Sequence, residues 1–129
     1  MLRFVLLLLL FLPASAVAQS VDCANTSIQL ELNYCAEQDW QAADADLNRV
    51  YKDTMAAMKA MDQSLPPELR GAAETLRDAQ RAWITFRDKN CNLAGYPMRG
   101  GSAEPLLIYG CLRQMTLDRT AELRGLTAY

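Results

Sequence analysis

The sequence predicts an all-α protein, a small up-down helical bundle with two disulfides. Apolar residues recur at steps of three and four along three segments, which is the period of an amphipathic helix. No segment alternates between apolar and polar residues for long enough to indicate a strand. The 129 residues contain four cysteines, an even number that can form two disulfides. This length is typical of one domain.

The first residues resemble a secretory signal peptide. Arg3 is followed by an unbroken apolar run over 4–12, then by Pro13 and small residues over 14–18. The run is too short for a membrane-spanning helix, which needs about 20 apolar residues. We expect residues 1–18 to be removed after Ala18, with Ala16 as the second candidate, leaving a single domain over 19–129. The mature protein is then periplasmic or secreted, with no membrane attachment, because Asp22 before Cys23 does not fit a lipoprotein signal.

The first helix is expected to begin near 25–27, where Thr26 and Gln29 have the spacing of a capping box. Its apolar stripe runs from Ile28 to Met61, with one loose step that allows a break near 37–39. The prolines at 66–67 end the segment, because the residue before a proline avoids helical angles.

The second helix is expected to start at Pro67, since proline suits a first helical position, and to end around 89–91. Gly71 costs such a helix about 1 kcal/mol relative to alanine, so its first turn would fray. A loop without periodicity follows over 92–105. A last apolar stripe over 107–126 predicts the third helix.

The cysteines are expected to pair as neighbours in the chain, although the sequence alone allows three pairings. Each neighbour pair closes a short loop between two predicted elements, a constraint worth about 3 kcal/mol. A metal or redox site is not expected, because the sequence has no Cys-x-x-Cys and no histidine. The expected disulfides are Cys23–Cys35 and Cys91–Cys111.

The charge and composition argue against most catalytic and nucleic-acid-binding functions. The chain carries a net charge of −2, and removal of Arg3 with the signal peptide makes it −3. A net acidic chain without a basic run is a poor nucleic-acid binder. The absence of histidine removes the commonest general base and metal ligand. No acidic pair has a spacing that distinguishes it from a solvated helix face. We therefore expect no enzyme activity, no metal and no cofactor.

Several polar residues fall on or beside the apolar stripes. We interpret them as a structural network that fixes the register of the bundle, because a buried charge without a partner costs several kcal/mol. The alternative is a polar functional site shared between helices. The candidate members are Asp46, Gln80, Arg87, Asp88 and Arg119.

The loop inside the expected Cys91–Cys111 ring is the candidate partner-binding segment. Glycines allow close approach to a partner, and tyrosine and arginine are frequent interface anchors. The alternative is a plain turn in which Ser102 caps the last helix. The candidate binding residues are Tyr96, Arg99, Gly100, Gly101 and Ser102.

Together, several segments resemble the lysozyme inhibitor LprI N-terminal domain family of small exported bacterial proteins. The most specific are Asp44 to Asn48 and the Ala-Gln-Arg-Ala-Trp run over 79–83, with two cysteines before them and two after them. The resemblance covers nearly all of the mature chain. It implies a helical, disulfide-bonded, non-catalytic protein and, as an expectation, inhibition of lysozyme. No inhibitory residues are carried over.

Two functions are therefore expected. In the first, the protein is a periplasmic lysozyme inhibitor that acts by protein–protein contact. The loop would then enter the cleft of a basic lysozyme, with Arg99 facing the two active-site carboxylates and Tyr96 and Ser102 beside it. The alternative is an envelope adaptor or binding module of unknown partner without lysozyme inhibition. The expected partner is lysozyme or another envelope protein.

Overall fold

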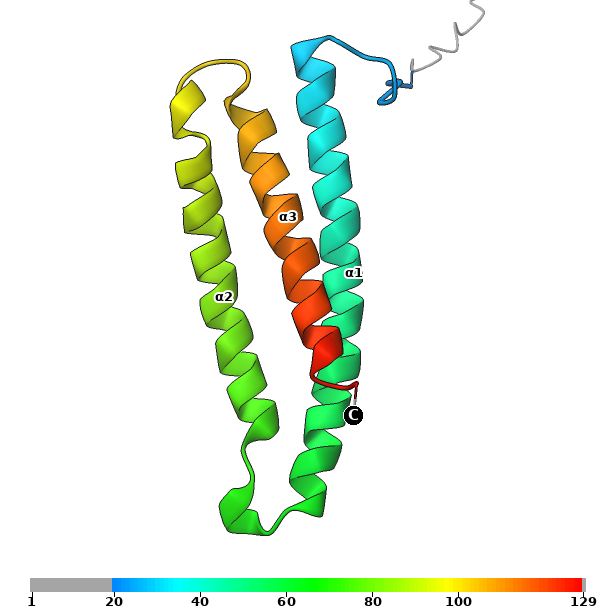
Figure 1. Cartoon of the computed structure of the whole chain (residues 1–129), viewed down its shortest axis with the longest axis vertical. Helices are drawn as coiled ribbons and strands as arrows, with labels where there is room; N and C mark the ends of the chain where they lie inside the picture. Colours follow the sequence, from blue (N-terminus) through cyan, green and yellow to red (C-terminus); the bar gives the residue numbers. More distant parts are fainter. Residues whose placement is uncertain (1–19, 129) are drawn as a thin grey trace, which may run out of the picture.

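The computed structural model describes residues 20–128 and confirms the all-α fold with an up-down order of three helices (Figure 1). No strand occurs in this part of the chain. The expected signal peptide, residues 1–18, lies outside the described residues. Within 20–128, none of the helices has an apolar stretch that could cross a bilayer. The elements in order are α1 (Gln29–Ser64), η1 (Pro67–Leu69), α2 (Ala72–Ala94), η2 (Tyr96–Met98) and α3 (Glu104–Gly125).

Helix α1 is one continuous helix of 36 residues, about 54 Å long at 1.5 Å per residue. The break that the sequence allowed near 37–39 does not occur. Neither glycine nor proline occurs between Gln29 and Ser64, so nothing in the backbone interrupts the helical hydrogen bonds. The helix ends at Ser64, just before the prolines at 66–67, as expected.

The predicted capping box at the start of α1 is wrong. The helix begins later than expected: its N-cap residue is Ile28, without a side-chain cap. The Thr26 hydroxyl instead accepts the Ile28 backbone N–H at 3.1 Å and donates to the carboxylate of Glu31. The Gln29 amide donates to Asn33. The threonine therefore forms a local turn before the helix, a use of its hydroxyl that competes with capping.

Helix α2 begins at Ala72 and not at Pro67, which starts the short turn η1. Gly71 separates the two with a φ of +142°, a conformation that side-chain-bearing residues rarely adopt. The N–H groups that start α2 are capped from the other helix. The Asp62 carboxylate accepts the backbone N–H groups of Gly71, Ala72 and Ala73 at 2.9–3.0 Å. At its other end α2 runs to Ala94, past the expected end at 89–91.

The Asp62 cap predicts an acid-sensitive contribution to stability. The N–H groups of Ala73, Gly71 and Ala72 hold the pKa of Asp62 below its ordinary value of 3.8. A carboxylate whose pKa is lower in the folded than in the unfolded protein stabilises the fold fully at a pH above its unfolded-state pKa. This stabilisation is lost as the pH falls through the folded-state pKa. We expect Asp62→Ala to lower the Tm by a few degrees at pH 7, and the gap to wild type to close below about pH 4. Thermal unfolding followed by circular dichroism from pH 7 to pH 2.5 measures this gap.

The matched control for this prediction is Asp39→Ala, which removes an exposed carboxylate from the same helix. Its Tm should follow that of wild type across the whole pH range. If Asp62→Ala and Asp39→Ala behave alike, the carboxylate of Asp62 does not cap α2.

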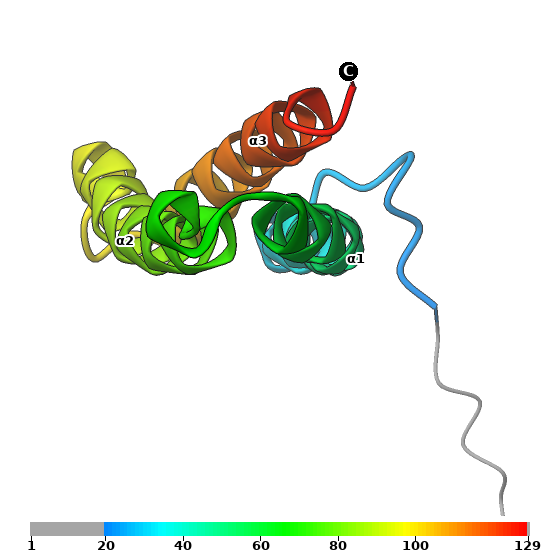
Figure 2. The ribbon, with the colours of Figure 1, turned by 90° about the horizontal axis from the view of Figure 1, so that it is seen from below.

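The three helices form an open bundle in which α3 packs along one side of the α1–α2 pair (Figure 2). Three buried threonines lie in this packing, and the Thr54 hydroxyl donates to the carbonyls of Val50 and Leu123 at 2.9 and 3.3 Å. Because α3 ends at Gly125, before the turn between α1 and α2, a largely apolar cavity of about 400 Å³ is left beside its last turn. The buried apolar residues are Ala43, Leu47, Val50, Met58, Leu76, Cys91, Leu112 and Leu123.

Candidate functional site

Both disulfides lie at the same end of the bundle. The expected neighbour pairing is confirmed: Cys23 is bonded to Cys35 and Cys91 to Cys111. The first bond ties the segment before α1 to its second turn, and the second joins the end of α2 to the start of α3. We call the region formed by residues 20–35 and 91–111 the disulfide-braced end; it is the upper end in Figure 1. The candidate binding loop is part of it.

Glu104 organises the candidate loop. Its carboxylate accepts the Gly100 backbone N–H at 2.8 Å and the Arg99 guanidinium at 2.7 Å. The Gly100 N–H, together with the Arg99 guanidinium, holds the pKa of Glu104 below its ordinary value. Gly100 has a φ of +77°, which explains the need for glycine there. Glu104 is not among the binding residues predicted from the sequence, although its place four residues after Gly100 and just before Pro105 suits a residue that closes a turn.

The last helix begins at Glu104, and the alternative in which Ser102 caps it is wrong. The N-cap residue is Ala103, without a side-chain cap. Ser102 contributes its backbone carbonyl instead, which accepts the Asn33 side-chain amide at 2.8 Å. This bond ties the loop to α1. The loop is therefore fixed by a disulfide, an ion pair and a hydrogen bond from α1.

Large apolar side chains are exposed at this end of the bundle. Single exposed apolar residues are ordinary on protein surfaces, but a group of them at one end indicates an interaction surface. Arg99 is also exposed and lies over the Tyr96 ring, with its guanidinium carbon 4.9 Å from the ring centroid. Aromatic residues, methionine and arginine are enriched in protein–protein interfaces. The exposed apolar residues at the disulfide-braced end are Ile28, Leu30, Tyr34, Leu93, Tyr96, Met98 and Leu107.

The polar residues on the apolar stripes form two clusters around tryptophans. Arg87 is 7% exposed and donates to Asp44 at 3.0 Å and to Asp88 at 2.9 Å. Its guanidinium carbon lies 5.0 Å from the ring centroid of Trp83 and 5.9 Å from that of Trp40. The second cluster is centred on Arg119, which donates to Gln80 at 3.0 Å and to Glu122 at 2.8 Å.

Asp46 is not brought together with Arg87 or Arg119. Its carboxylate pairs with Arg49 on α1 and, at 2.7 Å, with Arg124 on α3. Asp44 takes the place beside Arg87. Two residues on a helix point about 200° apart when they are two positions apart, so the two aspartates cannot face the same neighbour. The sequence shows both aspartates but does not show which one faces α2.

The sequence of this chain is similar to a described protein family and to a bacterial protein. A family model described as lysozyme inhibitor LprI matches residues 22–123. The chain is 49% identical over 124 residues to an uncharacterised protein of Rhizobium meliloti (strain 1021), an alignment that covers 94% of this chain and 89% of that protein. No solved structure gives a significant match.

Proposed function

This chain belongs to the lysozyme inhibitor LprI family, and from that membership we propose that it is an exported, non-catalytic protein that inhibits lysozyme by direct contact. The two disulfides support an extracytoplasmic location, because disulfides persist in oxidising compartments. The observation that carries the proposal is the disulfide-braced end, where a fixed loop and exposed apolar side chains occur together. We propose this end as the inhibitory surface.

The fixed loop supports this assignment on energetic grounds. A protein interface loses free energy when flexible side chains and loops become ordered on binding. Here the Cys91–Cys111 bond, the Glu104 hydrogen bonds and the bond from Asn33 order the loop before any partner arrives. Tyr96, which is 56% exposed, and Met98 then meet the partner from a prepared position.

The contacts of Arg99 refine its expected role. Its guanidinium is already paired with Glu104, so a carboxylate of lysozyme has to compete with that pair for it. We therefore propose the apolar side chains of Leu93, Tyr96 and Met98 as the main anchors. Arg99 contributes the polar edge of the same surface.

The net charge of the mature protein supports association with a basic enzyme. A charge of −3 attracts a positively charged partner over distances of about a Debye length. This attraction raises the association rate more than it changes the final complex. Inhibition should accordingly weaken as the salt concentration rises.

A pair of exposed leucines gives a sharp test of the surface. Leu93 at the disulfide-braced end is 65% exposed, and Leu69 in η1 at the opposite end is 64% exposed. We expect Leu93→Asp to raise the concentration needed for half-inhibition by about tenfold or more, because a charge replaces an anchor. Leu69→Asp should leave it unchanged. A cell-wall turbidity assay with lysozyme measures both variants against wild type.

The assay tests the location of the inhibitory surface separately from lysozyme inhibition itself. Equal inhibition by the two leucine variants would contradict the disulfide-braced end as the inhibitory surface. If the wild-type protein itself gives no protection at a large molar excess, that lysozyme is not a target. The expected alternative, an envelope binding module without lysozyme inhibition, would then be tested by pull-down with the same two variants.

A further inference from the structure

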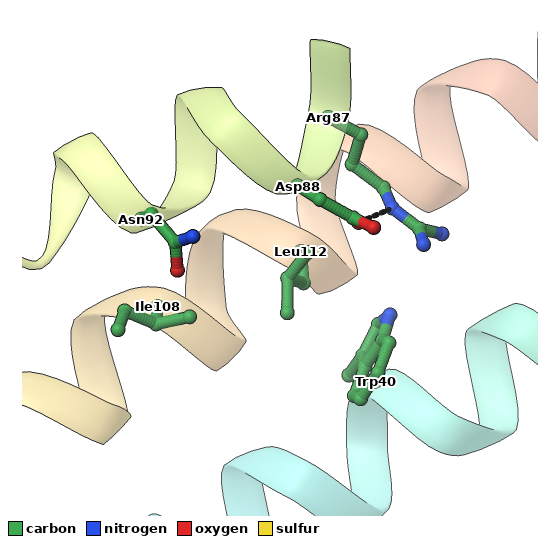
Figure 3. A pocket seen from close by; sticks show the side chains of 6 residues that line it. All are labelled: Trp40, Arg87, Asp88, Asn92, Ile108 and Leu112. Carbon is green, nitrogen blue, oxygen red and sulfur yellow. Dashed lines mark hydrogen bonds and ion pairs between the residues drawn. The ribbon is translucent and has the colours of Figure 1, made fainter. Parts of the chain in front are cut away.

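A second candidate site lies inside the bundle, away from the exposed loop. A cavity of about 190 Å³, open to solvent on one side, forms where the three helices meet (Figure 3). This is far more than the 10–15 Å³ that one water molecule requires, and less than the roughly 300 Å³ of a typical ligand pocket. It therefore suits one functional group of a ligand. Its lining residues are Trp40 from α1, Arg87, Asp88 and Asn92 from α2, and Ile108 and Leu112 from α3.

An unpartnered hydrogen-bond donor lies at the edge of this cavity. The Trp40 indole nitrogen is buried and has no hydrogen-bond partner, which is true of no other buried side-chain nitrogen or oxygen in residues 20–128. Leaving such a donor unpaired costs about 1–3 kcal/mol. Figure 3 shows this nitrogen directed toward the guanidinium of Arg87, which is itself only a donor. Two donors directed toward one another favour an acceptor oxygen between them.

The charges around the cavity favour a neutral acceptor. Arg87 is already paired with two carboxylates, those of Asp44 and Asp88. An anionic ligand would meet a net negative cluster there. Asp88 uses Oδ1 for Arg87, and its half-exposed carboxylate can also accept a ligand N–H. On the opposite side, Ile108 and Leu112 supply aliphatic contacts that suit a methyl group.

We propose that this cavity binds an acetamido group, such as that of an N-acetylated amino sugar. Because the Trp40 indole nitrogen is buried, binding requires a side-chain movement that exposes it to the cavity. Its N–H then donates to the carbonyl oxygen, the amide N–H donates to Asp88, and the methyl group packs against Ile108 and Leu112. Asn92, exposed at the mouth, contacts the polar remainder of the ligand. Asn92 and Ile108 belong to the disulfide-braced end, but the site uses none of the side chains proposed as lysozyme contacts, namely Leu93, Tyr96, Met98 and Arg99. Each proposal can therefore fail without the other.

The two tryptophans of the chain make the test selective. In a ¹⁵N-labelled wild-type protein, N-acetylglucosamine should shift the Trp40 indole signal in a saturable way and the Trp83 signal less. Glucose, which lacks the acetamido group, should shift neither. N-methylacetamide carries the same amide group without a sugar. If it shifts the Trp40 signal as N-acetylglucosamine does, the amide group is sufficient for binding. If it binds more weakly, the sugar ring adds contacts.

Two variants test the assigned contacts. Trp40→Phe keeps a ring against Tyr109 but removes the donor, and should weaken N-acetylglucosamine binding roughly three- to tenfold, measured from backbone amide shifts. Trp83→Phe is the matched control and should bind as wild type does. Asn92→Leu, at an exposed position, should also weaken binding without affecting folding. No saturable shift, an equal response to glucose, or unchanged binding by Trp40→Phe and Asn92→Leu overturns the proposal.

Discussion

Removal of the Cys91–Cys111 disulfide by the double substitution Cys91→Ala and Cys111→Ala is expected to lower the free energy of unfolding by about 3 kcal/mol. The bond joins residues 20 apart in the chain, and its loss releases that loop in the unfolded state. Small domains have a net stability of about 5–15 kcal/mol, so this change is a large fraction of the total. Urea unfolding followed by circular dichroism measures the difference.

The same variant should also lose inhibitory activity beyond its loss of stability. At a temperature where the variant is still folded, the loop is no longer tied at its base, and ordering it opposes binding. Leu69→Asp, which leaves the disulfide intact, provides the comparison for a surface change. A double variant that unfolds at the wild-type urea concentration would contradict the stabilising role, and full inhibition by a folded double variant would contradict the ordering argument.

Replacement of Arg87 by alanine is expected to destabilise the protein by about 2–4 kcal/mol. The guanidinium is buried between two tryptophan rings and pairs with Asp44 and Asp88. Its removal takes away both stacking contacts, leaves a void and strands the Asp44 carboxylate. The two aspartates are partly exposed, which keeps the cost below that of a fully buried broken pair. Thermal and urea unfolding both report the change.

A matched control uses the other ion pair between α1 and a second helix. Arg124 pairs with Asp46 at 2.7 Å, but both side chains are well exposed. Exposed ion pairs contribute little, so Arg124→Ala should change stability only slightly. If the two arginine variants lose the same stability, burial between the tryptophans does not distinguish Arg87. Tryptophan emission should shift in the Arg87 variant and not in the Arg124 variant.

The helices were predictable from the sequence because the spacing of apolar residues indicates which helix face is buried. This spacing does not depend on which element packs against that face. The ends of the helices were not predictable, because they depend on polar contacts that the apolar spacing does not report. The start of α2 is capped by Asp62, about ten positions earlier and on another helix. The turn before α3 depends on Glu104, whose partners come from the loop itself.

The candidate sites show the same limit. The disulfides and the loop could be located from the sequence, since each involves segments adjacent in the chain. That Asp44 and not Asp46 reaches Arg87 depends on the rotation of α1 about its axis. The exposure of Leu93 could not be predicted either, because a leucine in an amphipathic helix is normally assigned to the core.

The position of both disulfides at one end has a consequence for the motions of the bundle. Covalent bonds hold that end closed even when its hydrogen bonds open briefly. The opposite end has the Asp62 cap but no disulfide, and it borders the cavity of about 400 Å³. Amide hydrogens around 58–76 should therefore exchange with solvent through small local openings, and those flanking Cys91 only through global unfolding. We therefore expect the molecule to open from the end distant from its proposed binding surface, which would keep its shape during such openings.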